Sequence, residues 1–118
     1  MSEEANPFGN IYISHRAIAT ISSQSALESY GVVGFAPKNL AQGLAQVLTK
    51  DPTLGVDVLY DATGITIDMY IIVEYGTRIK SVASSVAENV RYCVERAIGL
   101  PVKQVNIHVR GLRISNTD

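Results

Sequence analysis

The sequence contains no tryptophan and only one cysteine, Cys93, among its 118 residues. A single cysteine cannot form an internal disulfide, and the only imidazoles are those of His15 and His108. These residues are too few for a Cys/His catalytic dyad or a metal cluster, and no serine stands in a GxSxG or SxxK motif. We therefore expect no enzyme activity, no metal and no cofactor.

The chain also lacks an excess of one charge, because 10 Lys and Arg stand against 11 Asp and Glu, for a formal net charge of -1. No positive field is then available to attract phosphate backbones, so we expect no nucleic-acid partner. The segment YGVVG, residues 30–34, resembles the GxxG loop of K-homology domains. Its two central residues are valines, however, and the glycines are better explained by a tight backbone turn onto a sheet.

Long apolar runs and a secretion signal are missing as well. The longest apolar run is MYIIV, residues 69–73, whereas a membrane-spanning helix needs about 20 residues. The first residues, MSEEANPFGN, lack the basic and apolar regions of a signal peptide. We expect a cytoplasmic protein that does not insert into a membrane and whose membrane association, where it occurs, goes through a partner.

What the sequence does contain is the composition of a globular protein, with 47% hydrophobic and 18% charged residues. A chain of this length forms one ordinary domain. We predict a single domain over residues 9–114, preceded by a flexible leader at 1–8 and followed by a flexible end at 115–118.

Apolar periodicity predicts both strands and helices along this domain. Period-two alternation predicts strands at residues 11–13, 32–33, 56–60, 65–75 and 103–110, the second short enough to be an extended linker. Helical periodicity predicts helices at residues 15–29, 37–48 and 78–98. Ser14 and Thr77 are the expected N-caps, Gly99 is the expected end of the last helix, and residues 111–118 are expected to fray.

This order of elements favours an α+β fold, a two-layer sandwich in which a mixed β-sheet has its helices packed mainly on one face. The helix between strands 65–75 and 103–110 is long enough for a right-handed crossover that makes these strands parallel. The odd-numbered residues of strand 65–75 would then point to the helices, and the even-numbered residues to a partly open face.

Strand 65–75 carries two carboxylates, Asp68 and Glu74. At about 3.3 Å per residue they lie about 20 Å apart, too far for a general acid/base pair. A symmetric turn instead places Asp57 directly opposite Asp68 across the hairpin. Two like charges at this spacing invite a cation, a shared proton or a neighbouring Lys or Arg, which Arg110 could supply. An Arg-paired or solvated structural feature is the main interpretation, and a ligand or metal role is the alternative.

The segment YGTRIK, residues 75–80, puts Thr77, Arg78 and Lys80 at the start of the longest helix, where backbone amides can hold an anion. The segment lacks the glycine-rich loop of a nucleotide site, and ordinary helix capping is the simpler explanation.

The open face of the sheet is the main candidate binding surface. Its side chains mix apolar area with hydrogen-bonding groups, which suits docking of a protein, including another copy of the chain. The predicted partner-binding residues are Tyr70, Ile72, Asn106, His108 and Arg110, with Asp57 and Asp68 contributing charge. A plain solvated face is the alternative.

Four segments carry a resemblance to a known family. They are IYIS at 11–14, YGVVG at 30–34, IDMYIIVEYGT at 67–77 and VNIHVRGLR at 105–113. In this order they resemble the alkaline shock protein family of Gram-positive bacteria, and specifically its short YloU-like members. The resemblance extends from about Gly9 to Ile114.

The resemblance implies a cytoplasmic, non-enzymatic protein associated with cell-envelope stress homeostasis. Some longer relatives self-associate and are held at the membrane by a partner, and the short type is often encoded beside a kinase-like protein that phosphorylates fatty acids. We therefore expect a scaffold or accessory protein that acts through protein contacts, with self-association and a fatty acid kinase-like or membrane-anchored partner among them. A small-ligand or anion-binding subunit that works with such a kinase-like partner is the alternative.

Overall fold

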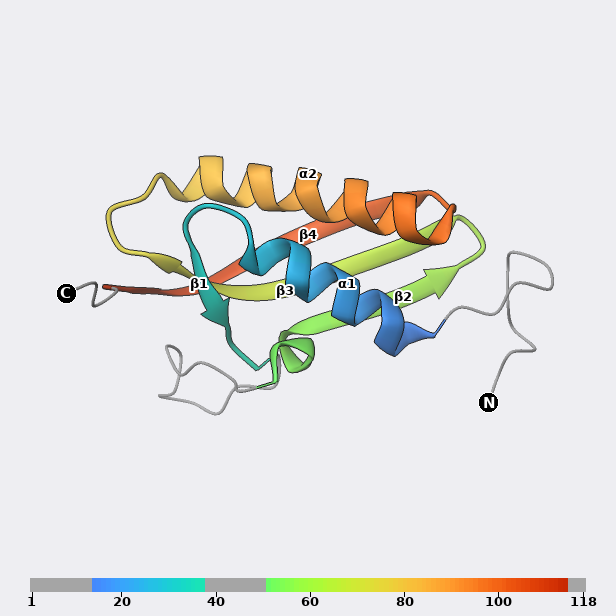
Figure 1. Cartoon of the computed structure of the whole chain (residues 1–118), viewed down its shortest axis with the longest axis horizontal. Coiled ribbons are helices and arrows are strands. Elements are labelled where there is room, and N and C mark those ends of the chain that lie inside the picture. Colours follow the sequence, from blue (N-terminus) through green and yellow to red (C-terminus); the bar gives the residue numbers. More distant parts are fainter. Residues whose placement is uncertain (1–13, 38–50, 115–118) are drawn as a thin grey trace.

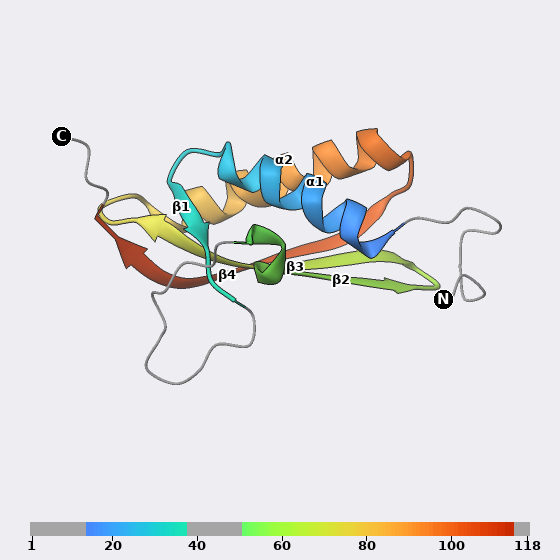
Figure 2. The same ribbon diagram turned by 60° about the horizontal axis from the view of Figure 1, so that its bottom comes forward.

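The computed structural model describes residues 14–37 and 51–114, which form two layers (Figure 1). One layer is a four-stranded sheet, and the other consists of helices on a single face of it (Figure 2). The elements in chain order are α1 (His15–Leu27), β1 (Val32–Phe35), the short 3-10 helix η2 (Pro52–Gly55), β2 (Val56–Asp61), β3 (Gly64–Glu74), α2 (Ile79–Ile98) and β4 (Val102–Arg113). The predicted α+β sandwich is confirmed.

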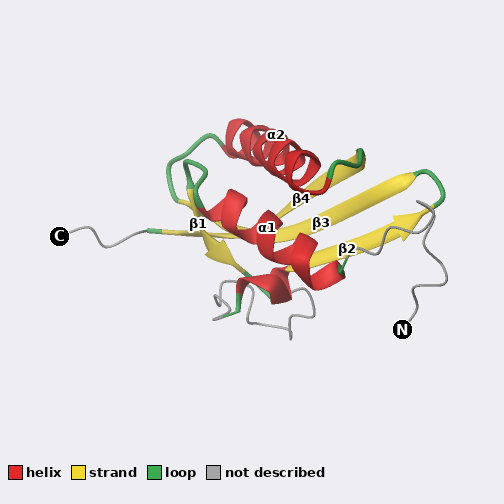
Figure 3. Ribbon diagram, turned by 45° about the vertical axis from the view of Figure 1, so that its right-hand side comes forward, coloured by secondary structure: helices red, strands yellow, loops and turns green. Residues whose placement is uncertain are grey.

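β3 is the central strand of the sheet (Figure 3). β4 runs parallel to it along one side, from the pair Ile65–Val102 to the pair Glu74–Arg113. β2 and β1 share the other side and are both antiparallel to β3. The mixed sheet and the parallel crossover through α2 are therefore as predicted.

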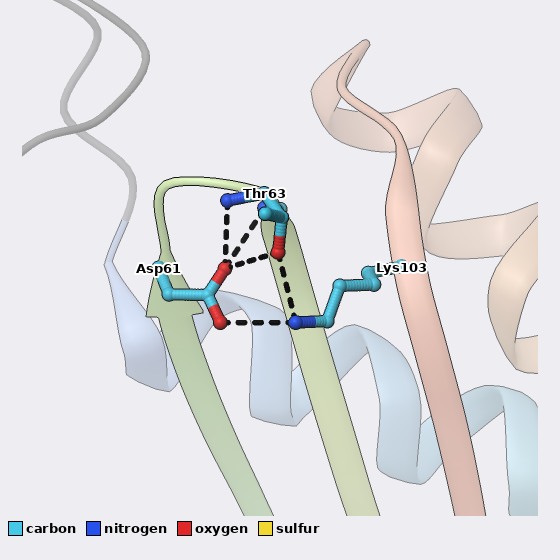
Figure 4. A network of polar contacts seen from close by, with 4 residues as sticks. Asp61, Thr63 and Lys103 are labelled. Carbon is cyan, nitrogen blue, oxygen red and sulfur yellow. Dashed lines mark hydrogen bonds and ion pairs between the residues drawn. The ribbon is translucent and has the colours of Figure 1, made fainter.

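The β2–β3 hairpin has the predicted register, including the pair Asp57–Asp68. Asp61 closes its turn, because Oδ1 accepts hydrogen bonds from the Thr63 amide at 2.8 Å and the Thr63 hydroxyl at 2.6 Å (Figure 4). Lys103 Nζ, from the start of β4, lies 3.0 Å from Asp61 Oδ2 and 2.8 Å from Thr63 Oγ1. The hydrogen bond from the Thr63 hydroxyl and the contact with Lys103 hold the pKa of Asp61 well below its usual range.

The helix ends follow the sequence at two of three predicted positions. Ser14 Oγ accepts hydrogen bonds from the amides of Arg16 and Ala17, so it caps α1 as predicted. Gly99 ends α2 in the left-handed conformation, with φ of 75°.

The predicted N-cap at Thr77 is wrong. Arg78 holds the N-cap position of α2, without a capping hydrogen bond from its side chain. The Thr77 hydroxyl instead donates to the carbonyl of Glu74 at 2.7 Å, and the Thr77 amide donates to the same carbonyl. Gly76, with φ of 93°, turns the chain so that Thr77 completes this turn and the helix starts one residue later.

The hydrophobic core lies between the sheet and the helices. It contains Ile65, Ile67, Met69, Ile71 and Val73 of β3, and Val82, Val86, Val90 and Val94 of α2. Two other apolar residues of α2 lie outside this core, because Ile79 is exposed and Cys93 is only half-buried. α1 packs against α2. Just beyond the end of α1, Asn89 Nδ2 donates to Ser29 Oγ at 2.9 Å.

One further predicted segment differs from the structure, and several others cannot be compared with it. Residues 111–113 were expected to fray, but they belong to β4, because Gly111, Leu112 and Arg113 pair with the end of β3. The predicted strand at 11–13, most of the predicted helix at 37–48 and both predicted flexible ends lie outside the described residues. Among residues 14–37 and 51–114, no helix is both long and apolar enough to span a membrane.

Candidate binding site on the open face of the sheet

The parallel register of β3 and β4 brings most of the predicted partner-binding residues together. Asp68 pairs with Asn106, and Tyr70 pairs with His108. Because side chains alternate across a strand, these four lie on the face opposite to the helix-side core residues Ile67, Met69 and Ile71. No described helix covers this face (Figure 2).

Asp68 is the polar centre of this surface. Its Oδ1 atom accepts a hydrogen bond from Asn106 Nδ2 and lies 3.0 Å from His108 Nε2. Since a carboxylate oxygen only accepts, Nε2 of His108 carries the proton in this contact. Gln104 Nε2 in turn donates to Asn106 Oδ1 at 2.9 Å. The side chains of His108 and Asp68 remain 42% and 27% exposed, so water and a partner can both reach them.

An aromatic stack continues the surface along the strands. The rings of Tyr70 and His108 are stacked, with centroids 4.6 Å apart and planes 13° apart. The guanidinium carbon of Arg110 lies 4.9 Å from the centroid of the Tyr70 ring, within cation–π range. We call the connected set the open-face ladder; it consists of Gln104, Asn106, Asp68, His108, Tyr70 and Arg110.

Asp57 lies beside this ladder. Its position opposite Asp68 is the one that the hairpin register predicts, and its side chain is exposed. Arg110 lies over Tyr70, while Asn106 and His108 contact Asp68. These contacts to Asp68 come from side chains of the neighbouring strand β4.

The prediction that Ile72 belongs to this binding surface is wrong. Ile72 is fully buried, with 0% of its surface exposed, although it is not part of the core cluster under the helices. It lies between Gly34 of β1 and Gly111 of β4, where the registers of both flanking strands shift. Such irregularities bend and twist a sheet, so the simple alternation that predicted exposure fails here.

The alternative anion site has a less favourable geometry. Arg78 and Lys80 are exposed at the start of α2, but the Thr77 hydroxyl is engaged by the Glu74 carbonyl. The adjacent hollow, about 340 Å³ in volume, is lined by Tyr30, Gly31, Val32, Val33, Glu74 and Thr77. This lining includes one acidic residue, Glu74, and neither Arg78 nor Lys80.

The open-face ladder offers hydrogen-bond donors and acceptors, a stacked aromatic pair and one cation, on a rigid two-strand base. This mixture suits recognition of another polar and aromatic surface. Within the described part of the chain, no three His, Cys, Asp or Glu side chains gather closely enough to hold a metal ion. The sequence prediction missed Gln104, although it belongs to the same alternating run as Asn106 and His108.

Comparison with solved structures supports the fold. A variant of the MamM C-terminal domain superimposes with a TM-score of 0.52 at 17% identity, covering 85% of this chain and 95% of that one. A second MamM variant gives a TM-score of 0.51 at 19% identity, covering 90% and 95%. At this level of identity the similarity concerns the fold alone.

Sequence comparison is more specific. The protein YloU of Bacillus subtilis (strain 168) is 45% identical over 111 residues, which is 92% of each chain. The protein Spy1614 of Streptococcus pyogenes serotype M6 is 32% identical, covering 90% of this chain and 89% of that one. The model of the alkaline shock protein 23 family, described as having a cell envelope-related function, matches residues 3–114. The chain belongs to the alkaline shock protein 23 family, as its four family-like segments indicated.

Proposed function

We propose that this protein is a non-catalytic scaffold or accessory protein of the cell envelope, which binds other proteins through the open face of its sheet. The membership of the alkaline shock protein 23 family supports the envelope-related role. The observation that carries the binding surface is the connected ladder from Gln104 to Arg110, which the fold holds on the face away from its core.

Three physical features favour a protein as the ligand. The ladder presents side chains on two adjacent strands, so it forms a surface and not a closed pocket for a small molecule. Tyrosine and arginine are among the residues that contribute most often to binding energy at protein interfaces, and Tyr70 and Arg110 are stacked here. The contacts within the ladder hold its side chains in place, which reduces the entropy lost on binding.

In this proposal the protein acts in the cytoplasm and reaches the membrane through a partner. A membrane-anchored protein or a fatty acid kinase-like protein fits this role. Self-association is a second use of the same kind of surface. An anion-binding role at Thr77, Arg78 and Lys80 gains no support from the geometry of the α2 start.

The test compares proteins captured from a native bacterial lysate that retains its membrane fraction. The bait is the full chain or its Tyr70→Ala or His108→Ala variant, with Tyr92→Ala as the matched control. Tyr92 is 59% exposed on α2, outside the open face, and also lies under an arginine, Arg96. We expect the open-face variants to lose a specific partner that Tyr92→Ala retains. Equal capture by all four baits, with circular dichroism confirming that each is folded, would exclude the open face as the binding surface.

A further inference from the structure

The outer edge of β4 is a surface separate from the open-face ladder. β4 pairs with β3 on one side, and no described strand lies along its other side. A strand in this position presents unpaired amide and carbonyl groups that can pair with another extended chain. The strand spans Val102–Arg113, long for an edge that is left open.

Two irregularities divide this edge. The register of β4 against β3 shifts between Val102 and Gln104 and again between Val109 and Gly111. At the first shift, both backbone polar groups of Val102 are already hydrogen-bonded to side chains of α2. Arg91 donates to the Val102 carbonyl, and Glu95 accepts from the Val102 amide. The regular stretch in between, residues 104–109, is therefore the part available for pairing with another strand.

The side chains of this stretch differ on its two faces. Val105, Ile107 and Val109 point to the helix side, where they pack against the core but remain only partly buried. Gln104, Asn106 and His108 point to the open face. A strand laid along the edge would cover the exposed flanks of the three apolar side chains, and that burial favours binding.

The charges of β4 disfavour a second copy of the chain as the occupant of this edge. β4 contains Lys103, Arg110 and Arg113 and no acidic residue. An antiparallel pair of two β4 strands centred on residues 104–109 would place Lys103 of each copy opposite Arg110 of the other. Like charges directly opposite each other destabilise a strand pair. An extended segment of a different protein, with a different charge pattern, therefore fits this edge better than a second β4.

The charges beside the edge of β4 also indicate which residues the extended partner segment should carry. Lys103 already contacts Asp61, and Arg113 lies at the far end of β4, so Arg110 is the cation next to the regular stretch. Arg110 is exposed and directed to the open side of the sheet. An extended segment with acidic residues on that side complements it.

We propose that the edge of β4 at residues 104–109 binds an extended segment of another protein by β-strand addition, and that this segment alternates apolar residues with acidic ones. The apolar side chains face Val105, Ile107 and Val109, and the acidic ones face Arg110. The site uses the backbone edge of residues 104–109, whereas the open-face ladder uses the side chains of Gln104, Asn106 and His108 from the same stretch. Arg110 serves both surfaces.

The probe is a fluorescein-labelled, capped six-residue peptide of alternating Val and Glu, titrated with the full chain and followed by fluorescence anisotropy. Two N-methylated versions of this peptide are compared. In the first, every second amide is methylated; in the second, the remaining amides are methylated instead. In a strand, one set of amides bonds to the neighbouring strand and the other points away. We expect one methylated peptide to bind at least about tenfold more weakly and the other to bind like the parent, because only the first loses its backbone hydrogen bonds to β4.

Two further comparisons test the same site. A peptide with Lys in place of Glu should bind at least about tenfold more weakly, and the Arg110→Glu variant should reverse this preference. Tyr92→Ala, which changes α2 and neither the edge nor the ladder, should bind the Val-Glu peptide like the parent chain. The open-face proposal is tested by capture from the lysate and not by this peptide, so failure of one proposal can be told apart from failure of the other.

Several results would overturn β-strand addition at β4. One is no binding of the parent peptide at about 1 mM; another is equal binding of both methylated peptides. Protection by the peptide of amides other than those of residues 104–109 in hydrogen exchange would equally overturn it.

Discussion

The two faces of β3 are built from the same strand but have different roles. On the helix side, Ile65, Ile67, Met69 and Ile71 are each 0% exposed and fill the core. On the open side, Asp68 and Tyr70 are only half-buried, and their contacts run sideways to Asn106, His108 and Arg110. The buried apolar area of β3 therefore lies on its helix side, which makes that side the main source of stability, while the open side carries the surface that we propose for binding.

The largest expected effect on stability comes from truncating a buried side chain on the helix side of β3. Ile67→Ala should lower the free energy of unfolding by about 2–5 kcal/mol, because it removes a fully buried side chain and leaves a cavity. Its neighbour Thr66 points to the other face and is half-buried, so Thr66→Ala should cost less than about 1 kcal/mol. Urea unfolding followed by circular dichroism measures both. Similar losses for the two variants would show that the faces are not energetically distinct.

The next effect concerns the close approach of the backbone to α2. Gly31 has φ of 91°, and a Cβ atom there would lie 2.7 Å from Val82 Cγ2. Gly31→Ala should therefore destabilise the fold by about 1–3 kcal/mol. Gly76 has a similar φ of 93° but no atom within 4 Å of the added Cβ, so Gly76→Ala isolates the backbone strain, about 1 kcal/mol. Thermal unfolding measures the stability of both variants. An equal loss of stability in the two would show that the close packing of Gly31 against α2 adds nothing to the effect of the backbone strain.

A smaller effect of opposite sign is expected where α1 meets the core. The hydroxyl of Ser22 is buried and has no hydrogen-bond partner among the described residues. Removing it in Ser22→Ala should stabilise the protein by up to about 1 kcal/mol, because an unsatisfied buried polar group is costly. Ser29 is the matched control, since its hydroxyl accepts from Asn89 and donates to the carbonyl of Ser25. Ser29→Ala should therefore destabilise the protein. A gain of stability in both variants would contradict the distinction between an unsatisfied hydroxyl at Ser22 and a hydrogen-bonded one at Ser29.

The smallest effect is expected at the exposed hairpin turn, which ties β4 and its open-face residues to β2. The hydrogen bond from Thr63 and the contact with Lys103 lower the pKa of Asp61 in the folded state. A depressed pKa stabilises the fold above the unfolded value of about 3.9, and this stability is lost as pH falls below it. Asp61→Asn should therefore be less stable at pH 7 but lose less stability between pH 5 and pH 2. Chemical unfolding at each pH measures the stability of both proteins. If the parent chain and Asp61→Asn lost the same stability across this pH range, the result would contradict the account.

Much of the fold could be predicted because it follows from local patterns. The hairpin register that opposes Asp57 and Asp68 follows from matching apolar residues across a two-residue turn. The crossover helix sets the parallel direction of β4, and this direction brings Asn106 and His108 beside Asp68.

The errors arise where neighbouring strands decide the outcome. Ile72 follows the alternation in sequence, but shifts in β1 and β4 beside it remove it from the exposed surface. Thr77 is a good N-cap residue by type, yet the turn at Gly76 takes its hydroxyl. The sequence likewise does not reveal that Arg110 stacks on Tyr70, since this depends on the residue-by-residue alignment of two strands.

The central claim is that the open face binds proteins and the helix layer does not. The most direct measurement places the photo-crosslinking residue p-benzoylphenylalanine at Tyr70 or at Tyr92, in living cells. Both substitutions replace an accessible tyrosine with a larger aromatic residue, on β3 and on α2 respectively. We predict protein adducts on irradiation with the residue at position 70 and none at position 92. Adducts at position 92, or none at position 70, would contradict the assignment of the open face as the binding surface.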